Sequence, residues 1–221
     1  MIKLKALKPL VIVGATGSGE IASSVFEDIN KVKPQWNILG FLNDVSEIDD
    51  HIGKYKIIGR SEQLLDYIQK GCHVHYTFHF NVKKKNERVN AFKELNIPLE
   101  AHASGVHPLA YLNPSSRIGA GSLMLPYSAT SGGSIVGDFC HMYTSSFLGH
   151  DTYLSSYSTL AAHSVLGARI KMGEGVHIGL NATIREDVVI GKYAIVGMAS
   201  NVISDIGDYE IFVGNPAKKN R

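Results

Sequence analysis

The sequence predicts two domains in series, a small α/β domain with a parallel sheet followed by a parallel β-helix. Three observations predict this fold class. A strict repeat of six residues fills the second half of the chain, apolar strand-like runs alternate with helical patterns in the first half, and a glycine-rich turn follows the first apolar run. The boundary is expected near Ser104 to Pro108, which gives domains of residues 1–106 and 107–221.

The composition is that of a globular chain, with 221 residues, 19% of them charged, and a net charge of +2. Charges of both signs are interleaved, which argues against the basic stripe of a nucleic-acid-binding protein. The apolar run Leu10 to Val13 is too short to span a membrane, and it ends in glycines rather than a signal-peptide cleavage site. Cys72 and Cys140 match no metal or redox spacing, which indicates free thiols in a reducing compartment. We therefore expect a cytoplasmic protein that binds neither nucleic acid nor membrane.

The first half alternates apolar, β-rich runs with helical patterns, as expected for a small parallel sheet with covering helices. The expected strands are Leu10 to Val13, Trp36 to Leu42, Tyr55 to Ile58, His73 to Phe80 and Pro98 to Ala101. The expected helices are Gly19 to Val32, Ser61 to Lys70 and Lys83 to Leu95.

Two segments of this domain are candidate ligand-binding turns. The first strand runs into Gly14-Ala15-Thr16-Gly17-Ser18-Gly19 and then a helix, whose unpaired N–H groups could bind a phosphate. The glycine spacing differs from the dinucleotide fingerprint, so a tight turn without a ligand remains an alternative. The second strand ends at Asn43 and Asp44, whose side chains could bind a ribose or a base, although a plain turn is an alternative there too.

The second half carries one large aliphatic residue every six positions. Thr130 is the one residue of this column that is not aliphatic; the column is Leu112, Ile118, Met124, Thr130, Val136, Met142, Leu148, Leu154, Leu160, Leu166, Met172, Ile178, Ile184, Ile190, Val196 and Val202. The residue directly after each column member is often glycine, and the fourth residue after each column member is small or β-branched. A period of six fits neither a helix nor an ordinary strand and is typical of a hexapeptide β-helix.

Three hexads make one triangular coil, so residues eighteen apart in sequence should stack in neighbouring coils. The aliphatic residues should fill the interior of the prism, with the small residues beside them. We expect the glycines to serve the corners, where they allow conformations that a Cβ would disfavour.

Taken together, four features resemble the bacterial nucleotide-amino-sugar N-acetyltransferases, relatives of the sialic-acid O-acetyltransferases. These features are the hexads, the glycine-rich turn in a short α/β domain, the pair His150-Asp151, and the ending Gly214-Asn215-Pro216-Ala217. The resemblance implies a left-handed coil and a Rossmann-like first domain that holds a UDP-, dTDP- or GDP-linked amino sugar. It also implies a homotrimer with acetyl-CoA bound at the subunit interfaces, and a role in polysaccharide biosynthesis.

The same resemblance implies roles for individual residues of the β-helix. His150 matches the general base, Asp151 the acidic neighbour that orients it, and Ala168 the position whose backbone N–H meets the thioester oxygen. Thr159 falls near the acetyl group, where some members have a second histidine.

Residues at the end of the chain and in the first domain are implied to bind the two substrates. Acetyl-CoA would contact Gly214, Asn215, Pro216 and Lys218, although a solvated terminus is an alternative for the lysine. The nucleotide sugar would contact Gly14, Thr16, Gly17, Ser18, Gly19, Asn43 and Asp44, with Ser18 in place of a frequent histidine.

Histidines of the repeat raise the alternative of a zinc site. His141 and His177 are 36 residues apart and should share one column, as in zinc-binding β-helix carbonic anhydrases. The third ligand expected five residues beyond His177 is Ala182, so we expect no metal and assign both histidines to the trimer interface or the substrate pocket.

Three functions follow from this reading of the sequence. The leading one is acetyl transfer from acetyl-CoA to the amino group of a nucleotide-linked amino deoxysugar, by direct attack with His150 as base. The alternatives are O-acetylation of a sugar of the sialic-acid type and a noncatalytic β-helix scaffold.

Overall fold

A computed structural model describes residues 6–14, 16–77 and 84–220 of the chain. The chain divides into two compact units, one made of Met1–His79 and Ile97–Gly105 and the other of Phe80–Asn96 and Val106–Arg221. The second junction, between Gly105 and Val106, lies one residue before the predicted boundary between residues 106 and 107. Residues 84–96, which the sequence prediction placed in the first domain, group with the β-helix.

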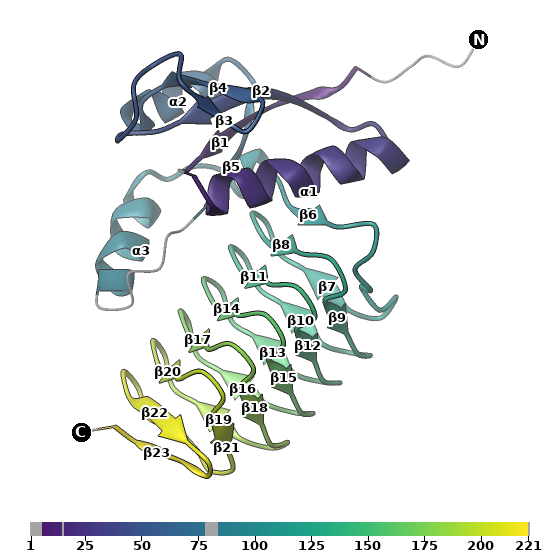
Figure 1. The fold of residues 1–221 in the computed structure, drawn as a ribbon, viewed down its shortest axis with the longest axis vertical. Coiled ribbons are helices and arrows are strands. Elements are labelled where there is room, and N and C mark those ends of the chain that lie inside the picture. Colours follow the sequence, from purple (N-terminus) through teal and green to yellow (C-terminus); the bar gives the residue numbers. More distant parts are fainter. Residues whose placement is uncertain (1–5, 15, 78–83, 221) are drawn as a thin grey trace. The chain divides into compact units, whose positions relative to one another are not determined.

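The first unit is built around a five-stranded sheet in the order β3-β4-β2-β1-β5 (Figure 1). Its strands are β1 (Lys8–Val13), β2 (Trp36–Leu42), β3 (His51–Ile52), β4 (Tyr55–Gly59) and β5 (His73–Tyr76). Its helices are α1 (Ser18–Val32), α2 (Leu64–Gln69) and the short 3₁₀ helices η1 (Ser61–Gln63) and η3 (Leu99–Ala101).

Parallel pairing joins β4, β2, β1 and β5, as the alternation of strands and helices predicts. Strand β1 is the centre of the core: Leu10, Val11 and Ile12 have no exposed surface. Helix α1 buries Ala22, Val25 and Phe26, spaced three and four residues apart so that they share one face.

Two parts of this unit differ from the sequence prediction. The segment Pro98 to Ala101 was predicted as a strand, but the N–H groups of Ala101 and His102 donate to the carbonyls three residues back and form η3. The prediction also missed β3, which is only two residues long and pairs antiparallel with β4. Ala15 and the predicted strand end at Phe80 lie outside the described residues.

The second unit is the predicted parallel β-helix, in which three sheets form the sides of each coil (Figure 1). Its strands are β6 (Gly105–Val106), β7 (Arg117–Ile118), β8 (Leu123–Met124), β9 (Ala129–Thr130), β10 (Ile135–Val136), β11 (His141–Met142), β12 (Phe147–Leu148), β13 (Tyr153–Leu154), β14 (Thr159–Leu160), β15 (Val165–Leu166), β16 (Lys171–Met172), β17 (His177–Ile178), β18 (Thr183–Ile184), β19 (Val189–Ile190), β20 (Ile195–Val196), β21 (Asn201–Val202), β22 (Ile211–Gly214) and β23 (Ala217–Lys219). From β7 to β21, each strand pairs with the strand eighteen residues away.

The aliphatic column predicted from the repeat fills the interior of this β-helix. Leu148, Leu154, Leu160 and Leu166 have no exposed surface and belong to one continuous apolar cluster. Burial of each such side chain stabilises the fold by about 1.5–3 kcal/mol. The period of six is therefore the direct cause of the coil, because it delivers one buried side chain to each side.

The glycines that follow the aliphatic residues are needed for a different reason from the one predicted. Gly119, Gly149 and Gly167 are not among the residues with positive φ. A Cβ on Gly167 would lie 2.6 Å from the Glu186 nitrogen of the next coil, and one on Gly149 would overlap the Gly167 carbonyl oxygen. Close stacking of backbones excludes a side chain here, whereas the left-handed conformation is adopted mostly by other residues two positions further on.

Helix α3 (Lys85–Glu94) packs against the β-helix within the second unit. The Phe92 ring meets the Phe139 ring edge to face with centroids 5.1 Å apart, and Phe139 stacks on Tyr157 at 5.0 Å. Lys93 Nζ lies 2.8 Å from a carboxylate oxygen of Glu174. These contacts attach the helix to a column of aromatic side chains on the coil.

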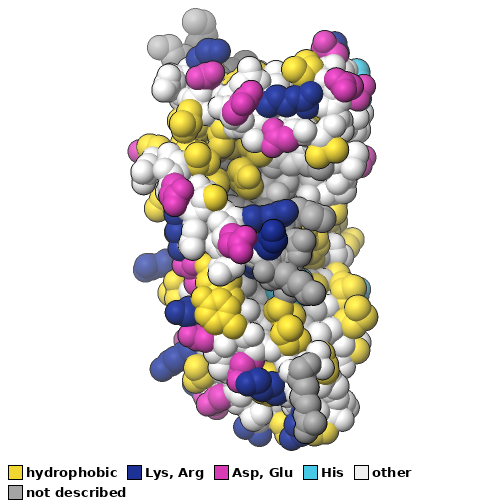
Figure 2. Space-filling model, turned by 90° about the vertical axis from the view of Figure 1, so that its left-hand side faces the viewer, with side chains coloured by type: hydrophobic (Ala, Val, Ile, Leu, Met, Phe, Trp, Pro, Cys, Tyr) yellow, Lys and Arg dark blue, Asp and Glu magenta, His cyan; other side chains and the backbone are white. Residues whose placement is uncertain are grey.

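Charged side chains of both signs are interspersed on the face drawn in Figure 2, in keeping with the net charge of +2. Within the described part of the chain, no helix has the length and apolar character needed to cross a membrane.

Candidate active site

His150 and Asp151 form a hydrogen-bonded pair at a corner between β12 and β13. His150 Nδ1 lies 2.8 Å from Asp151 Oδ2, and the two side chains are 52% and 63% exposed. A carboxylate oxygen accepts hydrogen bonds, so this contact favours the His150 tautomer that carries its proton on Nδ1. The lone pair on Nε2 is then available to take a proton from another molecule.

The next coil places a backbone donor above this pair. The Arg169 N–H donates to the His150 carbonyl at 2.9 Å, so the peptide of Ala168 lies one coil above His150. The Ala168 N–H has no hydrogen-bond partner among the described residues, and the residue is partly exposed. An unpaired N–H beside a base can stabilise negative charge that develops on an oxygen.

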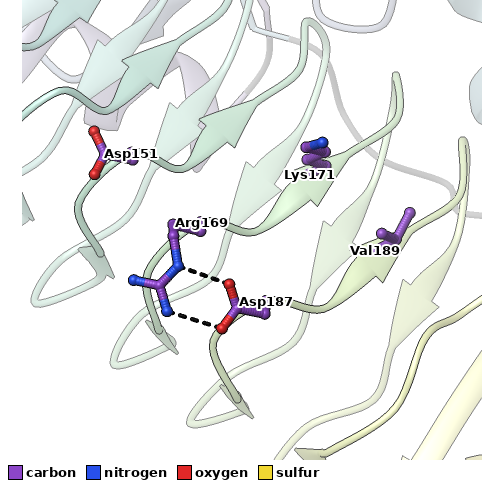
Figure 3. Close-up of a pocket in the computed structure, with 5 residues that line it drawn as sticks. All are labelled: Asp151, Arg169, Lys171, Asp187 and Val189. Atoms are coloured by element: carbon purple, nitrogen blue, oxygen red, sulfur yellow. Dashed lines mark hydrogen bonds and ion pairs between the residues drawn. The ribbon is translucent and has the colours of Figure 1, made fainter.

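A pocket of about 410 Å³ opens beside Asp151 (Figure 3). Arg169, Lys171, Asp187 and Val189 complete its lining. Arg169 makes a bidentate ion pair with Asp187 through Nε and Nη2, at 2.7 and 2.8 Å. The hydrogen bond from Arg169 lowers the pKa of Asp187 below its ordinary value, and the charges of Arg169, Arg185 and His150 lower it further.

Thr159 is buried, with 2% of its surface exposed, although the sequence prediction places it near the acetyl group. It lies between His141 and His177 in the register of one sheet. Its Oγ1 is buried and makes no hydrogen bond to any described residue. Burial lowers the pKa of His177 to about 4, so the ring is neutral near pH 7.

The predicted acetyl-CoA residues at the chain end lie far along the coil from His150. Gly214 ends β22, Asn215 and Pro216 form the turn to β23 through a cis peptide, and Lys218 is exposed on β23. Gly214 follows His150 by more than three coils, which corresponds to about 17 Å at the spacing of neighbouring strands.

The predicted phosphate-binding turn lies at the start of α1, in the first unit. Helix α1 begins at Ser18, and its N-cap residue Gly17 has a φ of 86° and makes no side-chain capping bond. Gly19 packs against Phe41, since a Cβ there would lie 2.9 Å from the ring. Gly14 donates its N–H to the Leu42 carbonyl at 3.1 Å, and Thr16 is exposed beside Gly17.

Asn43 and Asp44 are engaged in hydrogen bonds that shape the end of β2. Asn43 is 4% exposed, donates to the Gly14 carbonyl at 2.8 Å and accepts from the Val45 N–H at 2.8 Å. The Asp44 carboxylate accepts from the N–H of Ser61 at 2.8 Å and from its hydroxyl at 2.6 Å. Both residues therefore organise the loop, and a role in binding the nucleotide stays a prediction.

Sequence reasoning missed the Arg169–Asp187 pair. Both residues belong to the column that contains Asp151, and a step of eighteen residues from Asp151 would have found them. Within the described ranges, no group of three or more His, Cys, Asp and Glu side chains is arranged to hold a metal ion.

Solved structures share this fold over nearly the whole chain. They include the acetyltransferase domain of PglB from Neisseria gonorrhoeae, with a TM-score of 0.84, 22% identity, and coverage of 96% of this chain and 100% of the other. PerB from Caulobacter crescentus, in complex with CoA and GDP-perosamine, matches with a TM-score of 0.81, 20% identity, and coverage of 98% and 99%.

WeeI from Acinetobacter baumannii matches with a TM-score of 0.77, 23% identity, and coverage of 96% and 100%. No family model and no curated protein sequence matches the chain. The chain thus shares its fold with the acetyltransferase domain of PglB and with PerB, and its second unit is the parallel β-helix that the sequence predicted.

Proposed function

We propose that this protein transfers the acetyl group of acetyl-CoA to the amino group of a nucleotide-linked amino deoxysugar. The observation that carries the proposal is the His150–Asp151 pair at 2.8 Å, placed on a fold shared with PerB, which was solved with CoA and GDP-perosamine. The unpaired Ala168 N–H one coil above adds the donor that acyl transfer requires.

In the proposed mechanism the sugar amine attacks the thioester carbonyl carbon directly. His150 Nε2 takes the proton that the nitrogen loses as the C–N bond forms, and the Ala168 N–H stabilises the oxyanion. The C–S bond then breaks, and His150 returns the proton to the departing CoA sulfur. Asp151 holds the ring with Nδ1 protonated and stabilises its transient positive charge.

The proposal places acetyl-CoA along the β-helix, from Thr159 and Ala168 to the turn of Gly214, Asn215, Pro216 and Lys218. The separation of about 17 Å between His150 and this turn suits an extended cosubstrate. It requires that Thr159, now buried, contributes to the wall of the site rather than to direct contact with the acetyl group.

The proposal also includes a homotrimer of left-handed coils with active sites at its subunit interfaces. Its support is a set of large apolar side chains on the outside of two sides of the β-helix, with Ile135, Tyr153 and Val189 on one sheet and Phe147 and Val165 on another. Ile135, Phe147, Tyr153, Val165 and Val189 are 38–48% exposed in the single chain. A second copy would remove these surfaces from water.

The nucleotide is proposed to bind the first unit, as a Rossmann-like domain would hold it. The parallel strands β1 and β2 end next to the turn, and α1 begins there without a side-chain cap. Its free N–H groups carry the partial positive charge that favours a phosphate. The proposed setting is polysaccharide biosynthesis in the cytoplasm, where the free thiols of Cys72 and Cys140 would stay reduced.

The test is release of CoA thiol from acetyl-CoA with a panel of UDP-, dTDP- and GDP-linked amino deoxysugars. Amine acetylation predicts CoA release with one of these sugars. It also predicts a product about 42 Da heavier, in which an acetyl group has replaced one amine hydrogen to form an amide. Release with free sialic acid alone would replace the proposal with O-acetylation, and no release with any acceptor would favour a noncatalytic scaffold.

A further inference from the structure

Asp151 belongs to a corner column of the β-helix whose members share one backbone conformation. Gly133, Asp151, Arg169 and Asp187 follow one another at intervals of eighteen residues and have φ values of 70°, 55°, 56° and 62°. Side chains in this column therefore leave the coil in the same direction and stack on one another. The residues at positions 133 and 169, the neighbours of Asp151 in this column, therefore limit the orientation of its carboxylate.

On the side towards β10, the neighbour of Asp151 has no side chain. A Cβ on Gly133 would overlap Asp151 Oδ1 and would lie 3.5 Å from its Cγ. Asp151 Oδ1 thus occupies the space that any side chain at position 133 would need. With Oδ1 in this space, Oδ2 faces His150 Nδ1 at 2.8 Å.

On the other side, the neighbour is a cation that could compete with His150 for the carboxylate. The hydrogen bond and charge of Asp187 raise the pKa of Arg169, and the charges of Glu186 and Asp151 raise it further. Arg169 and Asp151 line the same pocket, yet Nε and Nη2 of Arg169 are both directed to Asp187 (Figure 3). A bidentate guanidinium–carboxylate pair is strong and geometrically specific.

We propose that Gly133 and Asp187 are positioning residues for the His150–Asp151 pair. Gly133 leaves the space that the Asp151 carboxylate fills, and Asp187 holds Arg169 so that it does not draw this carboxylate away from His150. The expected effect on catalysis rests on the proposed function. The expected effect on the tautomer of His150 does not, because it follows from the position of the Asp151 carboxylate alone.

Gly133→Ala tests the first half of the proposal. The overlap must push Asp151 Oδ1 away, so we expect kcat to fall on the order of 10-fold, with KM little changed, and the Nδ1–H tautomer of His150 to lose population. In an Asp151→Ala background the same substitution should change kcat by less than about twofold, since the group on which it acts is gone.

Two glycines supply matched controls. Gly132→Ala lies one position away, where a Cβ would make only an ordinary contact, 3.4 Å from Ser115 Oγ. Gly121→Ala reproduces the positive φ, at 66°, with a Cβ 2.5 Å from Phe139 at another corner. Both should keep the wild-type tautomer and kcat per folded enzyme. A Gly133→Ala variant that folds and keeps both would overturn the first half.

Asp187→Asn tests the second half. The amide keeps the size of the side chain but loses the charge, so Arg169 should turn to Asp151, and kcat should fall several-fold with loss of the Nδ1–H tautomer. Adding Arg169→Gln to this variant removes the competing cation. The double variant should therefore have a higher kcat than Asp187→Asn, equal to that of the single variant Arg169→Gln. A double variant no more active than Asp187→Asn would contradict the proposed competition.

The tautomer is measured by long-range ¹H–¹⁵N NMR correlations of the His150 ring in the full-length protein without substrate. If the variants shift the tautomer while the wild-type protein acetylates no acceptor, the positioning inference stands and the proposed function fails. If the enzyme is active but neither variant alters tautomer or kcat, the function stands and the inference fails.

Discussion

Replacing Asp151 by asparagine is expected to slow acetyl transfer about tenfold. The substitution removes one negative charge 2.8 Å from the His150 ring while keeping an oxygen that can accept its Nδ1–H. Both side chains are more than half exposed, so the attraction for the imidazolium formed in the reaction is that of two charges in water. At 2.8 Å this attraction is about 1.5 kcal/mol, which corresponds to about tenfold in rate.

The assay is the initial rate of CoA release at saturating acetyl-CoA and acceptor, from pH 6 to pH 9. The loss should appear in kcat, since the charge on His150 develops only as the amine is deprotonated. An unchanged kcat would refute the role of the carboxylate. A loss above about 10³-fold, as for a buried triad, would refute the argument from solvent screening.

Three further predictions concern stability. Leu148→Ala should lower the free energy of unfolding by about 3 kcal/mol in urea titrations, because Leu148 is fully buried in the coil. A change below about 1 kcal/mol would mean that the interior collapses around the cavity. Gly149→Ala should destabilise the fold by about 2 kcal/mol more than Gly132→Ala, since a Cβ at position 149 would overlap the Gly167 carbonyl oxygen. Equal stability of the two variants would contradict this prediction. Burial lowers the pKa of His75 to about 4, so between pH 6.5 and pH 4 the unfolded chain binds a proton that the folded chain excludes. The contribution of His75 to the free energy of unfolding should therefore fall with decreasing pH in that window, by up to about 1.4 kcal/mol per pH unit, and His75→Asn should remove that part of the slope.

The β-helix could be predicted almost completely from the sequence because one physical requirement recurs every six residues. Each side of a coil needs one buried aliphatic residue, so Leu148, Leu154 and Leu160 reveal both the period and the interior. The first domain was harder, since its elements depend on single short segments. Two residues suffice for β3, and no pattern in Leu99–Ala101 distinguishes a 3₁₀ turn from a short strand.

The candidate site was predicted in part, because some of its members have chemistry that a sequence displays and others act by geometry. His150 and Asp151 are adjacent and of a type suited to proton transfer. Gly133 contributes no functional group. It matters because it has no side chain, which leaves the space that the Asp151 carboxylate of the next coil fills, and only the structure shows this. Ion pairing between Arg169 and Asp187 likewise depends on side-chain direction at a corner with positive φ.

The most direct test of the account is the rate of acetyl transfer by His150→Ala, compared with wild type and with His163→Ala. His163 is an exposed histidine at another corner, with a φ of 60°, and serves as the matched control. If His150 is the general base, its loss should lower kcat by about 10²–10⁴-fold at neutral pH, with acetyl-CoA binding retained and His163→Ala fully active. Undiminished turnover by His150→Ala would contradict the proposed mechanism.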